Sequence, residues 1–194
     1  LDQLTPEQAE AIAELVFMEM LEAGYGAVAE FHYLHHDNGG VPYYNLSEMA
    51  ERIVAAARQT GMGLTLLPVL YMQGGCDGSA LQGGQQRFGC DWDMFSRLHD
   101  ESFKAVAKGP DDYSIGIAPH SLRAVSPDAL SRIREICLDG PVHMHLAEQV
   151  AEVAEVKAHL GARPVEWLLA NAEISPDWCL IHCTQMNATE TYGL

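Results

Sequence analysis

The segment 143–148 (HMHLAE) combines two imidazoles and a carboxylate within six residues. Side chains alternate between the two faces of a strand, so His143 and His145 share one face while Met144 lies on the other. Glu148 follows where the strand is expected to give way to a loop. Imidazole and carboxylate groups at a strand end suit a metal ion that activates water beside a proton shuttle. The same spacing is also typical of core histidines that hydrogen-bond to the backbone. Only the residues elsewhere in the chain can distinguish a metal site from such a core pair.

Strand-like and helix-like segments alternate along the chain. Apolar runs are predicted strands, and segments with apolar residues at helical spacing are predicted helices. No hairpin signal separates neighbouring strands, which indicates a parallel arrangement. The predicted strands cover residues 25–33, 63–71, 113–119, 141–146 and 178–183; helices are predicted after Thr5 and Ser47, over 91–107, after Ser126, over 150–160 and 164–169, and from near Asn187.

Repeated units of this kind build either a doubly wound sheet or a (β/α) barrel. No glycine fingerprint follows a strand, as a dinucleotide site in a doubly wound sheet would require. The chain also stops just after a strand, in the middle of a unit. We therefore expect an α/β fold in which residues 1–194 are the central part of a single catalytic barrel domain, truncated at both ends, with about five of the eight strand–helix units.

Titratable side chains follow four of the five predicted strands. In (β/α) barrels the chemistry is carried by the C-terminal ends of the strands, so these side chains are expected on one rim. The other strand is followed by a long Gly-rich loop, Gly74 to Gly89, of a length that often carries function. The titratable residues are Glu30, His32 and Tyr33 at the end of the first strand with His35 and His36 beyond it, His120 and Arg123 at the end of the third, His145 and Glu148 at the end of the fourth, and His182 at the end of the fifth.

Composition narrows the classes of partner. The formal net charge of -16 argues against nucleic acid and anionic membranes, because both require clustered Lys and Arg. No apolar run is long enough to span a bilayer. The five scattered cysteines fit reduced thiols better than a disulfide framework. We expect a cytoplasmic protein that binds neither nucleic acid nor membrane.

Four segments together resemble one enzyme family: 29–37 (AEFHYLHHD), 64–71 (LTLLPVLY), 119–125 (PHSLRAV) and 143–149 (HMHLAEQ). The chain is similar to the N-formimino-L-glutamate deiminases of the amidohydrolase superfamily, and the last two segments are the most specific. The resemblance implies a TIM barrel of the metal-dependent hydrolase type, of which this chain supplies strands 2 to 6. It also implies hydrolysis of the formimino C=N bond to N-formyl-L-glutamate and ammonia, a step of histidine degradation.

The resemblance assigns roles in the chemistry to three residues. His145 is expected to bind one zinc ion, whose remaining ligands lie outside this chain. Glu148 is expected to carry a proton from the attacking water to the leaving nitrogen. His182 is expected to hold or deprotonate that water and to stabilise charge at the tetrahedral centre.

Substrate binding is assigned to three further residues. Arg123 is expected to bind a substrate carboxylate through its planar donor fork, although a surface ion pair is the usual role of a lone arginine. Tyr33 is expected to contribute a hydroxyl to the same pocket, and His120 to lie near it. His143 is expected to support the site or the fold.

The remaining polar and aromatic residues are expected to take no part in the chemistry. His35 and His36 are predicted to be exposed loop residues, and His99 and His159 to be solvated on helices. Trp92, Phe95 and Phe103 are predicted packing residues, and Cys183 is predicted to face the helices.

The chain departs from the superfamily pattern in two ways. The His-x-His pair of the first barrel strand and the Asp of the eighth are absent, and Gln185 stands where many relatives carry a histidine. The segment alone is therefore not expected to bind zinc tightly or to turn over substrate. Two alternatives stay open: another amidohydrolase deaminase acting on a heterocyclic amine, or a catalytically silent fragment that folds by self-association as a homodimer.

Overall fold

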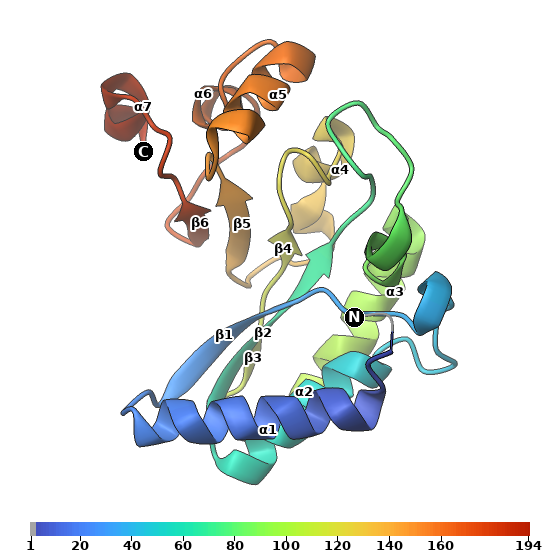
Figure 1. Ribbon diagram of the computed structural model, residues 1–194. Coiled ribbons are helices and arrows are strands. Elements are labelled where there is room, and N and C mark those ends of the chain that lie inside the picture. Colours follow the sequence, from blue (N-terminus) through green and yellow to red (C-terminus); the bar gives the residue numbers. More distant parts are fainter. Residues whose placement is uncertain (1–2) are drawn as a thin grey trace.

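The computed structural model describes residues 3–194, which form a parallel α/β structure (Figure 1). The strands are β1 (Ala27–His32), β2 (Gly63–Leu70), β3 (Ser114–Ile115), β4 (Ala118–Pro119), β5 (Val142–Leu146) and β6 (Trp178–His182). The helices are α1 (Pro6–Glu22), α2 (Glu48–Thr60), α3 (Trp92–Val106), α4 (Pro127–Ser131), α5 (Val150–Leu160), α6 (Pro164–Asn171) and α7 (Ala188–Gly193), with short 3-10 turns η1 (Asn38–Gly40), η2 (Gly83–Arg87) and η3 (Ile133–Glu135). Within this part of the chain no helix is long and apolar enough to cross a membrane.

All strand pairs are parallel, as the absence of hairpin signals predicted. β1 pairs with β2 from Ala27↔Gly63 to His32↔Pro68, and β5 pairs with β6. β2 pairs with both β3 and β4, and an Ile117↔Val142 bridge joins this group to β5. The resulting order β1-β2-β3/β4-β5-β6 follows the chain, which is the order of strands in a (β/α) barrel.

The third predicted strand is split where the chain changes partner. The Gly116 amide donates to Leu66 O of β2 at 2.9 Å, whereas the next amide, of Ile117, donates to Pro141 O beside β5 at 2.9 Å. A Cβ at Gly116 would lie 2.3 Å from Pro141 O, so only glycine allows this close approach. The interruption therefore lets one strand bridge the two halves of the sheet.

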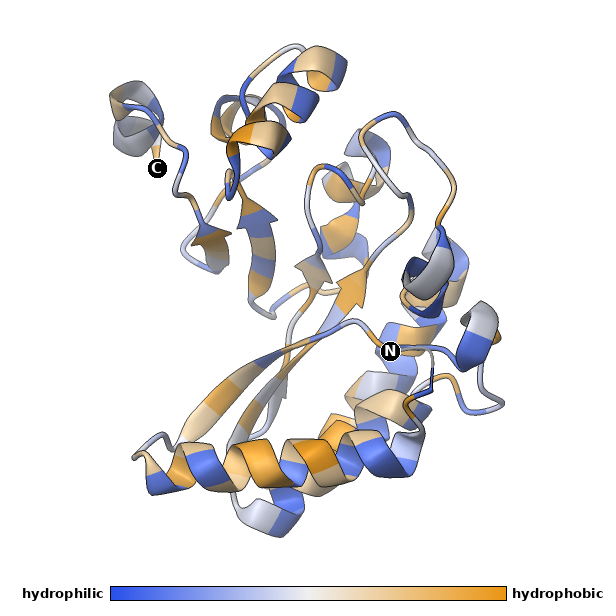
Figure 2. Cartoon of the chain, viewed as in Figure 1, coloured by the Kyte–Doolittle hydropathy of each residue, from blue (hydrophilic) through white to orange (hydrophobic). Residues whose placement is uncertain are grey.

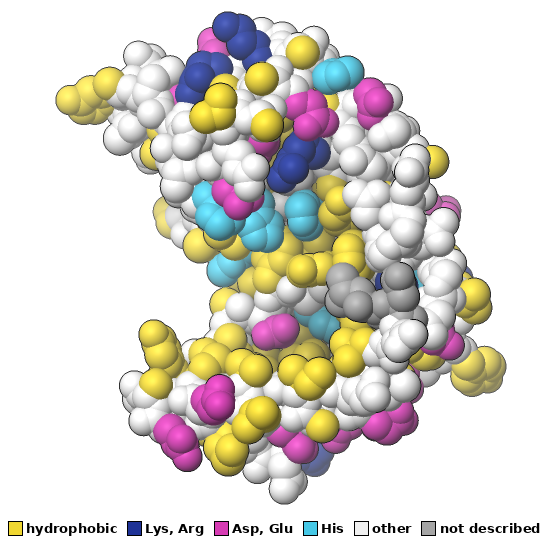
Figure 3. Space-filling model, viewed as in Figure 1, with side chains coloured by type: hydrophobic (Ala, Val, Ile, Leu, Met, Phe, Trp, Pro, Cys, Tyr) yellow, Lys and Arg dark blue, Asp and Glu magenta, His cyan; other side chains and the backbone are white. Residues whose placement is uncertain are grey.

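Helices cover one face of the sheet, and the opposite face, called the inner face below, turns away from them. Val142, Met144 and Leu146 are fully buried with Val156 and other residues of the α5–α6 region. His143 and His145 alternate with these residues, so they lie on the inner face, as their spacing predicted. Figure 3 shows that this face is hollowed.

Helix α1 carries an apolar surface that no other part of residues 3–194 covers. Its capping box joins Thr5 to Gln8, and its buried side chains include Phe17. Ile12 and Leu15 are each more than half exposed, and Figure 2 shows apolar segments along the visible surface of this helix. β1 and β6 end the sheet on its two sides, so both the helix layer and the sheet have open margins.

The predicted exposure of several side chains is wrong. His35 and His36 are 1% exposed because their Nε2 atoms lie 2.8 Å from Val69 O and Gly89 O. His99 is also buried, and its Nε2 lies 3.1 Å from Gly116 O. Phe103, by contrast, is 54% exposed on α3. His159 is exposed and Phe95 is fully buried, as predicted.

Glu30 and His32 do not belong to the predicted rim. They alternate with Phe31 and share the face of Val28, which packs against the helix-side core. Burial raises the pKa of the Glu30 carboxyl and lowers the pKa of His32 to about 4. Only Phe31 and Tyr33 of this strand end turn toward the inner face.

Acid is expected to destabilise the chain through His32. Its imidazole is 5% exposed and neutral in the fold, and its pKa is about 4, whereas an unfolded histidine titrates near 6.5. The unfolded state binds the extra proton, so stability is unaffected above pH 6.5 and falls as the pH drops toward 4, by about 2 kcal/mol at pH 5. Urea denaturation of wild type and His32→Phe at pH 7 and pH 5 measures the effect. A loss between these two pH values that is as large in His32→Phe as in wild type would contradict it, and His159→Phe, at an exposed histidine, is the matched control.

Candidate active site

Three histidines from adjacent strand ends meet on the inner face. The ring centroids of His120 and His145 are 5.1 Å apart, and those of His145 and His182 are 5.4 Å apart. The residues follow β4, lie in β5 and end β6, so the parallel register brings them together. Figure 3 shows histidine side chains gathered along one wall of the hollow. The structure thus brings together the three histidines that the sequence predicted to share one rim.

His145 has one ring nitrogen free for a ligand. Its Nδ1 lies 3.3 Å from His120 O, and since a carbonyl only accepts, Nδ1 carries the proton and Nε2 the lone pair. Phe31 packs edge-on against the ring at 4.3 Å and fixes its plane. Burial is the main reason that the pKa of His145 lies below its usual range. A neutral imidazole oriented in this way fits a metal ligand.

A metal site cannot be completed from residues 3–194, because they contain no group of three or more His, Cys, Asp or Glu side chains able to hold an ion. His143 shares the inner face with His145, and burial lowers its pKa, but nothing joins it to such a group. Among the residues present, the neutral and oriented imidazole of His145 is suited to contribute one ligand to a metal ion.

Glu148 and His182 face each other across the ends of β5 and β6. Glu148 Oε2 lies 3.7 Å from His182 Nε2, and each side chain is about one third exposed. Ala147, His182 and Cys183 all have positive φ, at 51°, 75° and 50°. Non-glycine residues rarely adopt this conformation, and such strain concentrates at functional sites. Both strands thus turn sharply where the two reactive side chains leave them.

Glu152 holds this turn and was missed from the sequence. Its buried carboxylate accepts hydrogen bonds from the amides of Ala147 at 3.0 Å and Glu148 at 2.9 Å. Thr184 Oγ1 donates to Glu148 O at 2.5 Å from the β6 side. An acidic residue in the first turn of a helix, three after its N-cap, was the available signal.

Removing the Glu152 carboxylate is expected to destabilise the chain. Glu152→Ala leaves two backbone amides without their charged acceptor, which should lower the free energy of unfolding by about 2–3 kcal/mol. Glu152→Gln keeps one carbonyl acceptor and should lose less. Urea denaturation followed by circular dichroism measures both variants, with Glu173→Ala, at an exposed residue, as control. Equal stability of Glu152→Ala and Glu173→Ala would overturn this role.

His120 lies beside a positive charge in a poorly solvated position. Burial, followed by the charges of His145 and Arg123, lowers the pKa of His120 to about 3. Its Nδ1 is 3.0 Å from Ser121 Oγ. His120 is therefore neutral near pH 7, and its ring can donate or accept a hydrogen bond without adding charge.

Arg123 is the unpaired cation of the site. Its Nε is buried and has no hydrogen-bond partner, and no carboxylate among residues 3–194 lies within 4.0 Å of its guanidinium. The alternative of a surface ion pair is therefore wrong. A half-buried guanidinium without a counter-ion is costly unless a ligand supplies the anion.

Tyr33 borders the same space. Its ring lies edge-on to His120 with centroids 6.3 Å apart and contacts Phe88 at 4.7 Å. The residue is 37% exposed. All six residues expected in the site, Tyr33, His120, Arg123, His145, Glu148 and His182, thus follow or end strands that open on the inner face.

Gln185 and Cys183 take structural positions. The Gln185 amide donates to Ala147 O at 2.8 Å, and Arg163 Nη2 donates to Gln185 O. Cys183 packs against the helix-side core, as predicted, and burial raises the pKa of its thiol. Neither residue brings a reactive group to the cluster.

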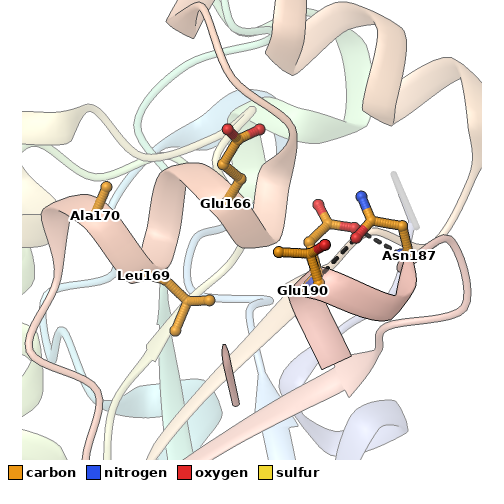
Figure 4. A pocket seen from close by; sticks show the side chains of 6 residues that line it. Glu166, Leu169, Ala170, Asn187 and Glu190 are labelled. Carbon is orange, nitrogen blue, oxygen red and sulfur yellow. Dashed lines mark hydrogen bonds between the residues drawn. The ribbon is translucent and has the colours of Figure 1, made fainter. Parts of the chain in front are cut away.

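A second concavity lies away from these residues. A pocket of about 490 Å³ between α6 and α7 is lined by Glu166, Leu169, Ala170, Asn187, Thr189 and Glu190 (Figure 4). Its buried carboxylate is already occupied, because Glu190 accepts hydrogen bonds from Arg163 Nε at 3.0 Å and from the Asn187 amide at 2.8 Å. No histidine lines it, so the strand-end cluster is the better candidate.

Comparison with known proteins identifies the family. Residues 1–190 match the sequence profile described as the amidohydrolase family. The chain belongs to the amidohydrolase family. Among similar amidohydrolases, the formimidoylglutamate deiminase of Pseudomonas aeruginosa is 42% identical over 193 residues, which are 99% of this chain and 42% of that protein.

Solved structures place the chain in the amidohydrolase barrel. A crystal structure of an amidohydrolase from Brucella melitensis superimposes with a TM-score of 0.95 at 52% identity, over 98% of this chain and 42% of that one. An adenosine deaminase from Xanthomonas campestris with bound zinc shares the fold, with a TM-score of 0.75 at 22% identity over 98% of this chain and 38% of that one. The chain thus spans about two fifths of the length of these relatives and forms part of a TIM-type barrel, as predicted.

Proposed function

We propose that this chain is the central part of an N-formimino-L-glutamate deiminase. The reaction adds water across the formimino C=N bond and releases ammonia, leaving N-formyl-L-glutamate. The observation that carries the proposal is the unpaired, half-buried Arg123 guanidinium beside the His120–His145–His182 cluster, because an amino-acid substrate brings the missing carboxylate. The 42% identity to the Pseudomonas aeruginosa formimidoylglutamate deiminase supports the same substrate.

The positions of the site residues allow each of them a specific role in the proposed hydrolysis. Glu148 takes a proton from the attacking water and hands it to the formimino nitrogen. It then moves the hydroxyl proton of the tetrahedral adduct to the same nitrogen, so that the C–N bond breaks, ammonia departs, the formyl C=O forms and the carboxylate is regenerated. His182, 3.7 Å from Glu148, orients that water and stabilises negative charge on the tetrahedral centre. Arg123 and the Tyr33 hydroxyl hold substrate carboxylates near neutral His120, whose ring contacts that of Tyr33.

We further propose that His145 Nε2 holds one divalent metal ion, zinc by the preference of imidazole, with the other ligands outside this chain. When bound, such an ion acidifies water and polarises the carbon that is attacked. The five free cysteines fit the cytoplasmic location proposed from the sequence. The net charge of -16 fits a partner that is a small molecule rather than a nucleic acid.

The test compares this chain with an extended protein, in which the flanking segments of the Pseudomonas aeruginosa relative complete both ends. Metal analysis and an ammonia-release assay with N-formimino-L-glutamate are run on both. Metal and ammonia release in the extended protein, with neither in the chain alone, are expected. An extended protein that is folded and metal-loaded but releases no ammonia would sink the proposed substrate.

A second candidate, deamination of a heterocyclic amine, has one observation in its favour. The 5-methylthioadenosine/S-adenosylhomocysteine deaminase of Shouchella clausii is 26% identical over 188 residues, 95% of this chain. A neutral heterocycle would leave Arg123 unpaired, so we place it second. Ammonia release from adenosine derivatives but not from N-formimino-L-glutamate would reverse this order.

A third possibility is a silent segment that associates through the open margin at α1. Sedimentation of the chain alone and of the extended protein separates it from the others. It predicts a dimer of the chain and no activity in the extended protein.

A further inference from the structure

Tyr71 joins the site from a strand end to which the sequence assigned no chemistry. It directly follows β2, two residues beyond Val69, which forms an inner-face cluster with Leu67 and Phe31. Its ring lies edge-on to His120 with centroids 4.6 Å apart. The side chain is half-buried, and its ring contacts His120, which also contacts the ring of Tyr33.

The Gly-rich loop fixes this hydroxyl through Gln85. Gln85 Oε1 accepts a hydrogen bond from the Gln82 amide at 3.0 Å, which settles the orientation of the side-chain amide. Its Nε2 must therefore donate, and it lies 3.1 Å from the Tyr71 hydroxyl oxygen. Because the Tyr71 oxygen accepts this bond, the hydroxyl proton is left to donate elsewhere.

Residues 3–194 offer that proton no acceptor within hydrogen-bond distance. Phe88, from the same loop, contacts the rings of both Tyr71 at 5.8 Å and Tyr33 at 4.7 Å and keeps them side by side. The site thus presents an oriented phenol donor against His120, whose pKa is in turn lowered in part by the charge of Arg123.

The loop does not need this hydroxyl to stay in place. The amides of Met72 and Gln73 donate to Ala124 O at 2.7 and 3.2 Å, and the Cys76 amide donates to Glu155 Oε1 at 2.9 Å. The backbone thus ties the loop to the segment that carries Arg123 and to α5.

We propose that Tyr71 determines substrate specificity: its hydroxyl, oriented by Gln85, donates a hydrogen bond to a carboxylate oxygen of an amino-acid-derived dicarboxylate. The assignment rests on the proposed function and adds a donor to Arg123 and Tyr33. Gln85 is a positioning residue, because it acts only through Tyr71. The Gly-rich loop thereby becomes part of substrate recognition.

Two substitutions in the extended protein test this role. Tyr71→Phe removes only the hydroxyl and is expected to raise KM for N-formimino-L-glutamate about 10- to 100-fold with little change in kcat, as for loss of one hydrogen bond to a charged group. Gln85→Glu still accepts from the Gln82 amide but draws the Tyr71 proton to itself, so it should raise KM similarly. Tyr113→Phe, at a buried phenol without a partner at the other end of the sheet, should leave KM unchanged.

Substrate analogues show which contact is lost. N-formimino derivatives that lack one or the other carboxylate are compared in wild type and Tyr71→Phe. The Tyr71→Phe penalty should vanish for the analogue that lacks the bound carboxylate and persist for the other. An equal penalty on all three substrates, or an unchanged KM, would overturn the assignment while the proposed function stands.

Failure of the proposed function gives a different pattern. If wild-type extended protein releases no ammonia, titration calorimetry with N-formyl-L-glutamate decides the role of Tyr71 alone. An affinity for N-formyl-L-glutamate that is at least tenfold weaker in Tyr71→Phe than in wild type supports the carboxylate contact. Equal binding, or binding by neither protein, removes it.

Discussion

Glu148→Gln is expected to lower kcat for ammonia release by the extended protein about 10²- to 10⁴-fold, the usual contribution of a positioned proton-transfer group. The amide has the shape of the carboxylate but cannot accept a proton from water. Its backbone amide stays bonded to Glu152, so the strand end should not move. KM should change little, because the proposed carboxylate ligands lie elsewhere.

The control for this experiment is Glu173→Gln, which makes the same chemical change at an exposed residue. Circular dichroism and metal analysis of Glu148→Gln show whether the fold and the metal site are intact. A fall in kcat of less than about fivefold, with metal content unchanged, would assign the proton transfer to another group. His182 is then the nearest candidate, 3.7 Å from Glu148.

The fold could be predicted from the sequence because its signals are local. Strand periodicity placed His143 and His145 on one face and Met144 on the other, and all three lie as expected. Strand-like and helix-like segments alternate along the chain, so the parallel topology needed no long-range information. The split of the third strand at Gly116 depends on Pro141, which is distant in sequence, and could not be anticipated.

The burial of the histidines after β1 could not be predicted for the same reason. His35 and His36 precede an Asp-Asn-Gly-Gly turn, which is typical of an exposed loop. Their acceptors, Val69 O and Gly89 O, lie 34 and 53 residues away in sequence. A backbone carbonyl that is contributed by another strand or loop cannot be recognised from the residues next to the histidine in sequence.

The sequence predicted that histidines at neighbouring strand ends would lie close together, but not the residues that hold them in place. The strand ends indicated His120, His145 and His182, which the structure brings together. Glu152 and Gln85 were missed because each bonds to another residue, Glu152 to the Ala147 amide and Gln85 to the Tyr71 hydroxyl, and lies in no recognisable motif. Arg123 was ambiguous in sequence, since only the absence of a nearby carboxylate distinguishes a ligand-binding guanidinium from an ion pair.

Arg123→Met is expected to raise KM for N-formimino-L-glutamate about 100- to 1000-fold in the extended protein, which corresponds to the loss of two hydrogen bonds to a carboxylate. Methionine retains much of the length and apolar contact of the side chain, so packing should be preserved. Arg123→Lys keeps the charge but not the planar fork and should recover only part of the loss. Arg134→Met, at a surface arginine 3.4 Å from Asp177, is the matched control and should leave KM unchanged.

The Arg123 variants also decide between the two deaminase hypotheses. For a dicarboxylate substrate, the loss of affinity in Arg123→Met should shrink when the analogue lacks the carboxylate that Arg123 binds. For a neutral heterocyclic amine, removal of an uncompensated buried charge should leave KM unchanged or lower it, because no anion replaces the lost solvation. The direction of the change in KM therefore identifies the class of substrate, even before the best substrate is known.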